Sequence, residues 1–404
     1  MSSIMTRSVD PEIKRDVLLL SLAAFASAAA LRMCDPMLPA LADAFDTTTA
    51  RAAIVVTATS IAYGICQLLF GPLGDRFGKF RIIAWACLVS TLGAAACALA
   101  PTLFALSLAR ALTGATTAAL IPLSMAWIGD VVPFDKRQPT LARLMSGQIV
   151  GLVSGQAFGG FFADTVGWRW GFVFLAVIYF IAGVFLLRTL RHMRPLANPS
   201  GTAGPGALAG IAMVLQSGRA RWILGIVFVE AMATFGVIAF IPAYLHEHFG
   251  ISLFHAGSVV AVFGLGGLLY TSMARRWVRA LGEVRLALLG GVLLAAAFLA
   301  LALATTWHWA IGACLFAGLG FYQLHNTLQT QATQMAPAAR GTAVSIFASS
   351  FFLGQALGVT MGALVVEDFG AVKLFAVSAL LLPLVGGVFA VHLRRQARQG
   401  QTSR

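Results

Sequence analysis

Charged residues are scarce in this chain of 404 residues, and that scarcity decides its broad class. Lys, Arg, Asp and Glu together make up 11% of the sequence, hydrophobic residues make up 59%, and the mean hydropathy is +0.86. Soluble domains carry about 25% charged residues. Water could not solvate the surface of so apolar a chain. The composition therefore excludes a soluble globular protein and predicts a chain embedded in a membrane.

Cysteine and the usual signatures of catalysis are also rare. The five cysteines occur singly within apolar runs, which argues against a disulfide framework or a metal cluster: Cys34, Cys66, Cys87, Cys97 and Cys314. We interpret His246 and His248, with His255 nearby, as surface residues and not as a metal site. The sequence contains no phosphate-binding loop, nucleophile triad or zinc-ligand spacing. We therefore expect neither an enzyme nor a cofactor.

The apolar runs predict an all-α membrane protein. A helix needs roughly 20 residues to cross a hydrocarbon core of about 30 Å. Twelve runs meet this length, near residues 17–41, 51–72, 82–100, 102–128, 140–163, 170–190, 221–245, 254–274, 285–305, 309–333, 341–366 and 370–393. We interpret the run through Pro39 as a complete span, not as a cleaved secretory signal.

The distribution of charge predicts the topology. If both termini are cytoplasmic, 23 of the 28 Lys and Arg residues lie on that side. Three lie outside, at Arg51, Arg169 and Lys373, and two lie within spans. The net charge of +13 is then explained by topology and by attraction to anionic lipid, so we expect no nucleic-acid partner. The expected location is a bacterial-type inner (plasma) membrane.

The chain also repeats itself at an offset of about half its length. The segment 39–45 returns as 242–249, and Gly155-Gln-Ala-Phe-Gly159 is echoed by Gly354-Gln-Ala-Leu-Gly358. Homologous halves are typical of transporters whose binding site lies at the membrane midplane. We expect two pseudo-symmetric six-helix bundles joined by a Gly-, Pro- and Ser-rich linker, with bounds at 1–195, 196–220 and 221–404. Residues 207–218 could form a short surface helix.

Glycine and charge gather between the second and third expected spans, in Gly71-Pro-Leu-Gly-Asp-Arg-Phe-Gly-Lys-Phe-Arg81. This loop resembles the G-x-L-x-D-R-x-G-[RK]-x-R signature of the major facilitator superfamily, matching at Gly71, Leu73, Asp75, Arg76, Gly78, Lys79 and Arg81. The resemblance implies a twelve-helix transporter that works by alternating access, with both termini in the cytoplasm.

The same loop predicts a conformational latch. We expect Asp75 to dock on Arg340 and the helix N-terminus that follows it when the cytoplasmic side is closed, and to release when it opens. Arg76 and Arg81 are expected to reach towards Asp130, at the end of the fourth span. The other predicted latch residues are Gly71, Gly74, Gly78 and Lys79.

Four ionisable residues fall within the expected spans: Arg32, Asp35, Arg110 and Glu230. Each costs roughly 2.5–3.5 kcal/mol at a helix centre on the insertion scale, so a functional role is the first interpretation. Arg32 and Asp35 lie three residues apart and could simply pair. However, Asp35-x-x-x-Pro39 resembles the first-span signature of the twelve-span drug:proton antiporter branch. That resemblance implies that Asp35 is the proton-coupling acid.

The other two buried charges have less specific signals. Arg110 opens Arg-Ala-Leu-Thr-Gly114, which resembles the R-x-x-x-G motif of the family, so we expect it to modulate Asp35 or to contact substrate. Glu230 is a second candidate for proton coupling. Its sequence context leaves open whether it titrates, pairs with a distant arginine or lines the central cavity.

Glycines recur at four-residue spacing in the fifth expected span, at Gly147, Gly151, Gly155 and Gly159, which predicts close packing against a neighbouring helix. The block resembles the antiporter motif G-P-x-x-G-G, with Gln156 in place of the proline. This departure reduces the support for antiport over uptake.

Polar residues within the spans predict a cavity for an amphiphilic or moderately polar solute. The expected substrate-binding residues are Arg32, Thr113, Thr117, Gln148, Gln156, Tyr322, Gln323, His325, Asn326, Gln329 and Gln355. We predict a monomeric, proton-coupled exporter of a small organic solute or drug. The alternatives are proton-coupled uptake, transport of a lysolipid or metabolite, and a transporter-like sensor that moves nothing.

Overall fold

The structure is a computed structural model that describes residues 11–192 and 207–402, and these residues form helices and short turns without strands. In chain order the helices are α1 (Pro11–Arg32), α2 (Leu38–Ala44), α3 (Thr49–Ala52), α4 (Ile54–Phe77), α5 (Lys79–Leu99), α6 (Leu103–Thr117), α7 (Leu120–Val131), α8 (Phe134–Asp164), α9 (Trp168–His192), α10 (Ala207–Gln216), α11 (Gly218–Ile238), α12 (Ile241–Phe249), α13 (Leu253–Ala302), α14 (His308–Ala332), the 3-10 turn η1 (Pro337–Ala339), α15 (Arg340–Phe369) and α16 (Ala371–Thr402).

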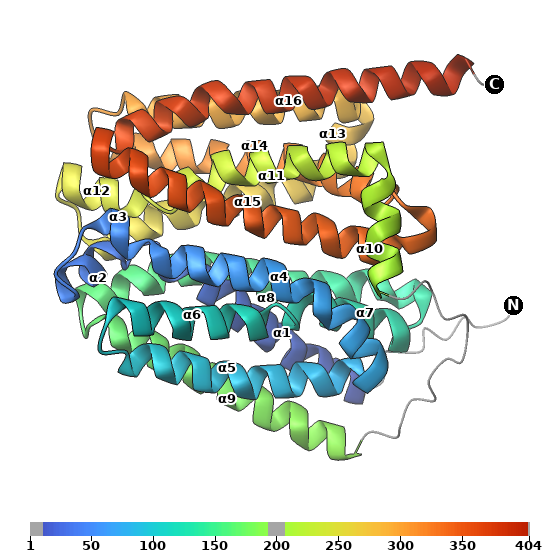
Figure 1. Ribbon diagram of the computed structural model, residues 1–404, viewed down its shortest axis with the longest axis horizontal. Helices are drawn as coiled ribbons and strands as arrows, with labels where there is room; N and C mark the ends of the chain where they lie inside the picture. Colours follow the sequence, from blue (N-terminus) through green and yellow to red (C-terminus); the bar gives the residue numbers. More distant parts are fainter. Residues whose placement is uncertain (1–10, 193–206, 403–404) are drawn as a thin grey trace, which may run out of the picture.

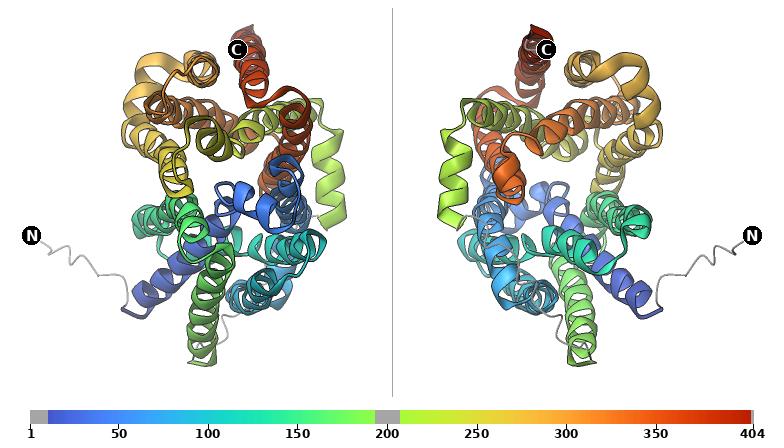
Figure 2. Two further views of the ribbon diagram at one scale, coloured as in Figure 1. Left: turned by 90° about the vertical axis from the view of Figure 1, so that its left-hand side faces the viewer. Right: turned by 90° about the vertical axis from the view of Figure 1, so that its right-hand side faces the viewer.

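The long helices run roughly parallel to one axis of the molecule (Figure 1). Helices α1 to α9, the first half, lie together, and α11 to α16, the second half, lie beside them (Figures 1 and 2). The two halves meet where α4 packs against α15 and α8 packs against α13. Helix α10 lies across one end and packs against α15 and α11. It matches the short helix expected at 207–218, whereas residues 196–206 of the expected linker lie outside the described residues.

Eight stretches of the described chain are long and apolar enough to cross a membrane: Thr49–Phe77, Lys79–Leu99, Leu103–Val131, Trp168–Arg191, Gly218–Phe249, Leu253–Ala302, Arg340–Phe369 and Ala371–Gln396. The sixth of these is α13, which is 50 residues long and changes direction at Gly282, where φ is 72°. A positive φ favours glycine because it has no Cβ. One glycine therefore joins two helical arms, 253–281 and 283–302.

The turn between α4 and α5 has the same construction. Helix α4 continues through Phe77, and the non-helical residue before α5 is Gly78, with φ of 92°. The expectation of an open loop from Gly71 to Arg81 was therefore wrong. Gly78 and Gly282 are 204 residues apart, as the internal repeat requires.

The first span of each half is interrupted. Residues 33–37 separate α1 from α2, and residues 239–240 separate α11 from α12, so the apolar run expected at 17–41 forms two helices. Pro36 and Pro39 explain the first break, because proline lacks an amide hydrogen for the helix ladder. Both α2 and α12 carry a proline in their first turn, Pro39 and Pro242.

Glycines bring two pairs of helices into backbone contact. Gly151 and Gly155 of α8 lie against the backbone of Phe25 and Ala29 in α1. In the second half, Gly354 and Gly358 of α15 lie against the backbone of Phe228 and Met232 in α11. The close packing predicted from the four-residue spacing is thus present, and the repeat places the same device in both halves.

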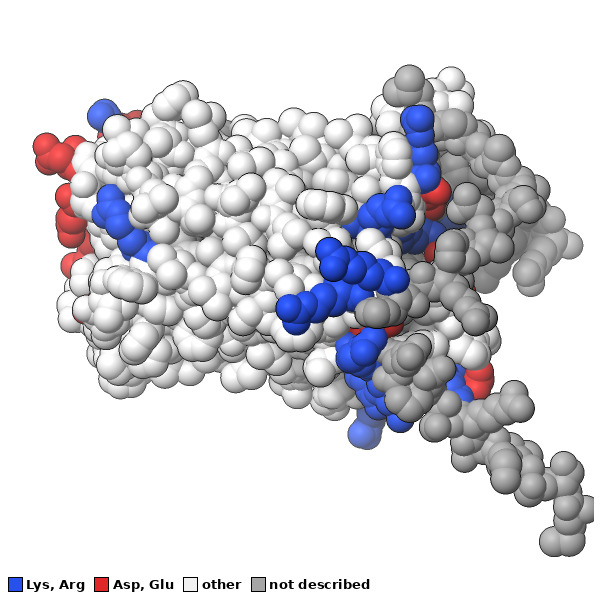
Figure 3. Space-filling view, turned by 90° about the horizontal axis from the view of Figure 1, so that it is seen from below, with Lys and Arg blue, Asp and Glu red and all other residues white. Residues whose placement is uncertain are grey.

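The two ends of the bundle differ in charge. Seen from below, Lys and Arg gather towards one end with some Asp and Glu among them, whereas the other end shows Asp and Glu with few Lys and Arg, and uncharged residues lie between the ends (Figure 3). We call the end with the turns at Gly78 and Gly282 the basic end, and the end with α2, α3 and α12 the acidic end. The beginning of α1 and the end of α16 both lie at the basic end (Figure 1).

Candidate functional site

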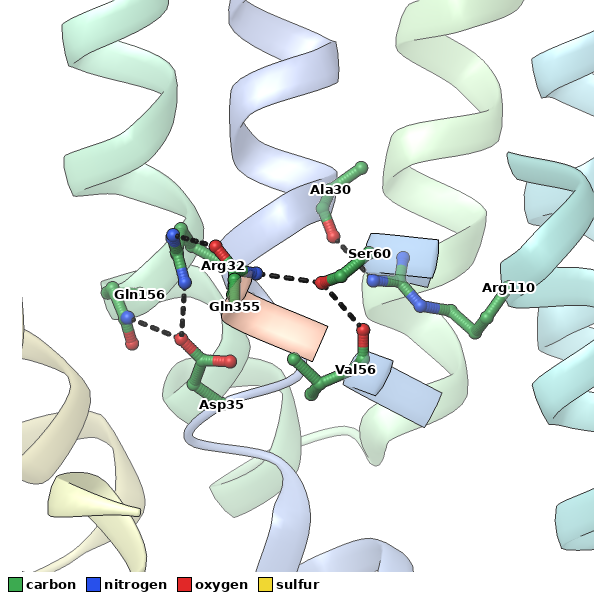
Figure 4. Close-up of polar contacts among 8 residues, drawn as sticks. All are labelled: Ala30, Arg32, Asp35, Val56, Ser60, Arg110, Gln156 and Gln355. Carbon is green, nitrogen blue, oxygen red and sulfur yellow. Dashed lines mark hydrogen bonds and ion pairs between the residues drawn. The ribbon is translucent and has the colours of Figure 1, made fainter. Parts of the chain in front are cut away.

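Asp35 lies in the interruption between α1 and α2, where its carboxyl group is fully buried. Its Oδ2 accepts a hydrogen bond from Nε2 of Gln156 in α8 at 2.9 Å and lies 3.7 Å from Nη1 of Arg32 (Figure 4). Gln156 is the residue that departs from the proline of the resembled motif. The departure therefore supplies a hydrogen-bond donor to the buried acid.

Arg32 connects this acid to the second half of the molecule. Its side chain is 6% exposed, and Nη2 donates to Oε1 of Gln355 in α15 at 2.9 Å. Its guanidinium carbon lies 4.2 Å from the ring centre of Phe235, in α11. Gln355 in turn donates to Oγ of Ser60 in α4 at 2.8 Å (Figure 4). The counter-ion of Asp35 is thus shared between the halves.

Arg110 is fully buried in α6, but it does not touch Asp35 directly. Its Nη2 donates to the carbonyl oxygen of Ala30 at 2.9 Å (Figure 4). Its guanidinium carbon lies 5.9 Å from the ring centre of Phe172. That carbonyl belongs to the last turn of α1, where carbonyls lack helical partners. Arg110 therefore caps the last turn of α1, which contains Arg32 and is followed by Asp35.

Glu230 is fully buried in α11 and pairs with His325 of α14, with Oε2 2.9 Å from Nδ1. Its Oε1 has no hydrogen-bond partner among the described residues. Of the alternatives that the sequence left open, the partner is a histidine and not a distant arginine. The two residues are 95 positions apart, and no sequence pattern connected them.

Several predicted substrate-binding residues use their polar groups elsewhere. Thr113 and Thr117 donate to carbonyls of their own helix, and Asn326 donates to the carbonyl of Tyr322. Gln156 and Gln355 bind Asp35 and Arg32, as described above. The remaining members differ in exposure: Gln323 is buried, Gln148 and Tyr322 are half-buried, and Gln329 is exposed. The structure thus brings together two smaller polar sets, one around Arg32 and Asp35 and the other at Glu230 and His325.

At the basic end, the predicted latch residues are arranged around Lys79. Its Nζ lies 2.6 Å from Oδ2 of Asp130 and 3.3 Å from Oδ1 of Asp75. The expectation that Arg76 and Arg81 reach towards Asp130 therefore named the wrong cation, because the turn at Gly78 directs Lys79 there instead. Within the described ranges Asp75 makes no ion pair with Arg340, and α10 packs beside that site, with Gly210 against Thr342.

The second half repeats this arrangement with different chemistry. Glu283 follows Gly282 as Lys79 follows Gly78, and its Oε2 accepts a hydrogen bond from Nε2 of Gln331 at 2.9 Å. Gln331 also accepts one from Arg219 at 2.7 Å. The second half thus has the acid Glu283 where the first half has the cation Lys79, and in both halves this residue makes a polar contact beside the turn.

Sequence reasoning missed the polar contacts that join the halves at the acidic end. The Asp164 carboxylate, at the end of α8, accepts hydrogen bonds from the backbone amides of Leu253 at 3.1 Å and Phe254 at 2.7 Å, in the first turn of α13. Thr49 donates to Glu247 at 2.9 Å, and Arg51 lies 3.3 Å from Glu367. A carboxylate just before a long span could have suggested a helix cap, but its partner lies 89 residues away.

Comparison with known proteins identifies the family. The Major Facilitator Superfamily model matches residues 20–359. The chain belongs to the major facilitator superfamily. Members of this superfamily are membrane transporters of small molecules, not enzymes, and the multi-pass helical architecture described above is theirs.

Individual superfamily members are distant in sequence. The MFS-type transporter YwfA of Bacillus subtilis is 25% identical over 257 residues, which is 62% of this chain and 60% of that protein's length. The inner membrane transport protein YnfM of Escherichia coli is 24% identical over 402 residues, or 96% of this chain and 93% of that one. A solved structure of an auto-inhibited peptide transporter of the POT family superposes with a TM-score of 0.76 over 94% of this chain and 97% of that chain, at 16% identity.

Proposed function

We propose that this protein is a proton-coupled exporter of a small organic solute, in which Asp35 carries the proton. The observation that carries the proposal is the position of Arg32, which lies against Asp35 of its own half and binds Gln355 and Phe235 of the other. Protonating Asp35 removes the negative charge that holds Arg32. The cation then depends on its contacts with the second half, so a proton on one half alters the contact between the two.

The distribution of polar contacts between the two halves supports an alternating-access mechanism. At the acidic end, polar contacts cross between the halves through Asp164, Thr49 and Arg51. At the basic end, the polar contacts described above join residues of the same half, as between Lys79 and Asp130 or Arg219 and Gln331. We interpret this as the state closed to the outside, in which Asp75 is released from its predicted docking site at Arg340.

The topology proposed for this function has twelve spans, with 1–195 and 221–404 as the moving bundles. The eight apolar stretches include both arms of α13, which count as two spans. Helices α1, α8 and α14 bring the number of proposed spans to twelve. They are less apolar than the other spans because they carry polar residues of the site, Arg32, Gln156 and His325. The positive-inside rule places the basic end and both termini in the cytoplasm. We propose a monomer in an inner membrane.

The test is flux in proteoliposomes under an imposed pH gradient, with a panel of drugs, sugars, organic acids and lysolipids. We expect solute movement against the direction of proton entry, and its loss in Asp35→Asn, which keeps the shape of the side chain but cannot ionise. The matched control is Asp43→Asn, an exposed acid in α2. Gradient-driven flux in Asp35→Asn equal to that of the unmodified protein would sink the proposal.

A further inference from the structure

An open cavity of about 610 Å³ lies beside the turn at Gly282, at the basic end of the second half. The turn and second arm of α13, the end of α14 and the end of α16 bound it, with Glu283, Arg285, Gln331, Leu393 and Arg394 among its lining residues. All the lining residues belong to the second half, and none belongs to the polar sets around Asp35 and Glu230. The cavity is therefore separate from the site described above.

The charged side chains in and beside this cavity are mostly arginines. Arg285 and Arg394 line it, both are exposed, and neither forms an ion pair within the described residues. Glu283 also lines it, but its Oε2 accepts a hydrogen bond from Gln331, which in turn accepts one from Arg219. Three arginines and one acid give a net charge of 3 − 1 = +2. The cavity therefore favours an anion.

The two unpaired arginines suit a phosphate group in particular. A guanidinium presents its N–H donors in a planar fork that matches two oxygens of a phosphate. Arg285 stands on α13 and Arg394 on α16, two helices that pack against each other. One phosphodiester held in the cavity could therefore accept hydrogen bonds from both helices.

The exposed side chains next to these arginines are apolar, and they share the helix faces of the arginines: Leu288, Leu289 and Val292 on α13, and Val391 on α16. The first three follow Arg285 by three, four and seven residues, and Val391 precedes Arg394 by three. Both directions lead away from the basic end, towards the middle of the membrane. An amphiphile with a phosphate headgroup and acyl chains matches the charged cavity and the apolar faces together, whereas a small soluble anion matches the cavity alone.

We propose that this cavity binds the headgroup phosphate of an anionic phospholipid between Arg285 and Arg394, with the acyl chains along the exposed face of the second arm of α13. Basic pockets between membrane helices on the cytoplasmic side are suited to such headgroups. The inference goes beyond the proposed function, because it concerns the lipid around the transporter and not its solute. It uses only the proposed topology, in which the basic end is cytoplasmic.

The test is native mass spectrometry of the purified full-length protein in detergent, titrated with phosphatidylglycerol. Phosphatidylcholine with the same acyl chains is the control for headgroup charge, and glycerol phosphate is the control for the chains. We expect the first phosphatidylglycerol to bind at least about fivefold more tightly than phosphatidylcholine, since one arginine near the surface contributes about this factor. Glycerol phosphate should show no comparable binding.

The double variant Arg285→Gln with Arg394→Gln should lose this preference. Its matched control is Arg275→Gln with Arg276→Gln, two exposed arginines on the first arm of α13 that do not line the cavity. The control removes the same charge from the same end of the molecule and should keep the preference.

Glu283→Gln gives a test of opposite sign, which remains informative if the double variant does not fold. It removes the one negative charge of the lining, so phosphatidylglycerol should bind about twofold more tightly or better. Equal affinity for the two lipids, or an unchanged preference in the double variant or in Glu283→Gln, would overturn the inference. Binding of glycerol phosphate as tight as that of phosphatidylglycerol would also overturn it, by showing a site for soluble anions. Because flux is not measured, each outcome is independent of the proposed function.

Discussion

The hydrogen bonds of Asp164 to the first turn of α13 allow a quantitative prediction about the closure of the acidic end. Asp164 caps the N-terminus of α13 but belongs to the opposite half of the molecule. Its hydrogen bonds therefore stabilise only the state in which the two halves touch at the acidic end. A helix cap contributes about 1 kcal/mol, within a range of roughly 0.5–2. The nearby ion pair between Arg51 and Glu367 has side chains that are 70% and 33% exposed. Such a pair contributes about 0–1 kcal/mol, so the cap is the stronger contact.

We therefore expect Asp164→Ala to shift the equilibrium towards the state open at the acidic end by about fivefold, which corresponds to about 1 kcal/mol. The assay is pulsed electron–electron distance measurement between spin labels at Asp43 and Thr306, both exposed near this end, in a Cys66→Ala background. Asp164→Asn keeps one acceptor oxygen and should give a smaller shift. Asp368→Ala, at the same end, is the control. An unchanged distance distribution in Asp164→Ala would refute the role of the cap.

Two further predictions concern the latch and the packing of the helices. Lys79→Ala frees Asp75 from its ion pair and so leaves it available to dock at Arg340. Distance measurements between spin labels on the two halves at the basic end should then show a larger population of the state closed at that end. An unchanged distance distribution would exclude Asp75 as the latch acid. Gly151→Ala should cost about 1–3 kcal/mol, since Gly151 lies against the backbone of Phe25. It should lower the melting temperature, whereas Gly312→Ala, with open space around it, should not; equal melting temperatures would contradict the packing.

Local patterns in the sequence predicted those parts of the fold that depend on neighbouring residues. The glycine spacing from Gly147 to Gly159 predicted close helix packing because a four-residue period fixes one helix face. The offset of 204 residues likewise placed Gly282 opposite Gly78. These signals require no knowledge of which helices meet.

The site was harder to predict, because its contacts join distant segments. Asp35 and Arg110 stood out because charge is costly in a span, but no local pattern indicated the hydrogen bond from the Gln156 amide to Asp35, which joins residues 121 positions apart. The pairing of Glu230 with His325 depends on how α11 and α14 pack. The break at 33–37 was missed because the apolar run continues through its prolines.

The single-residue turn at Gly282 has a consequence for where the chain tolerates insertions. The arms 253–281 and 283–302 are joined by one residue with non-helical φ and ψ, so the direction of each arm depends on the other. A tag or protease site inserted at this turn would therefore be expected to change the angle between the arms, and with it the packing of α13 against α14 and α16.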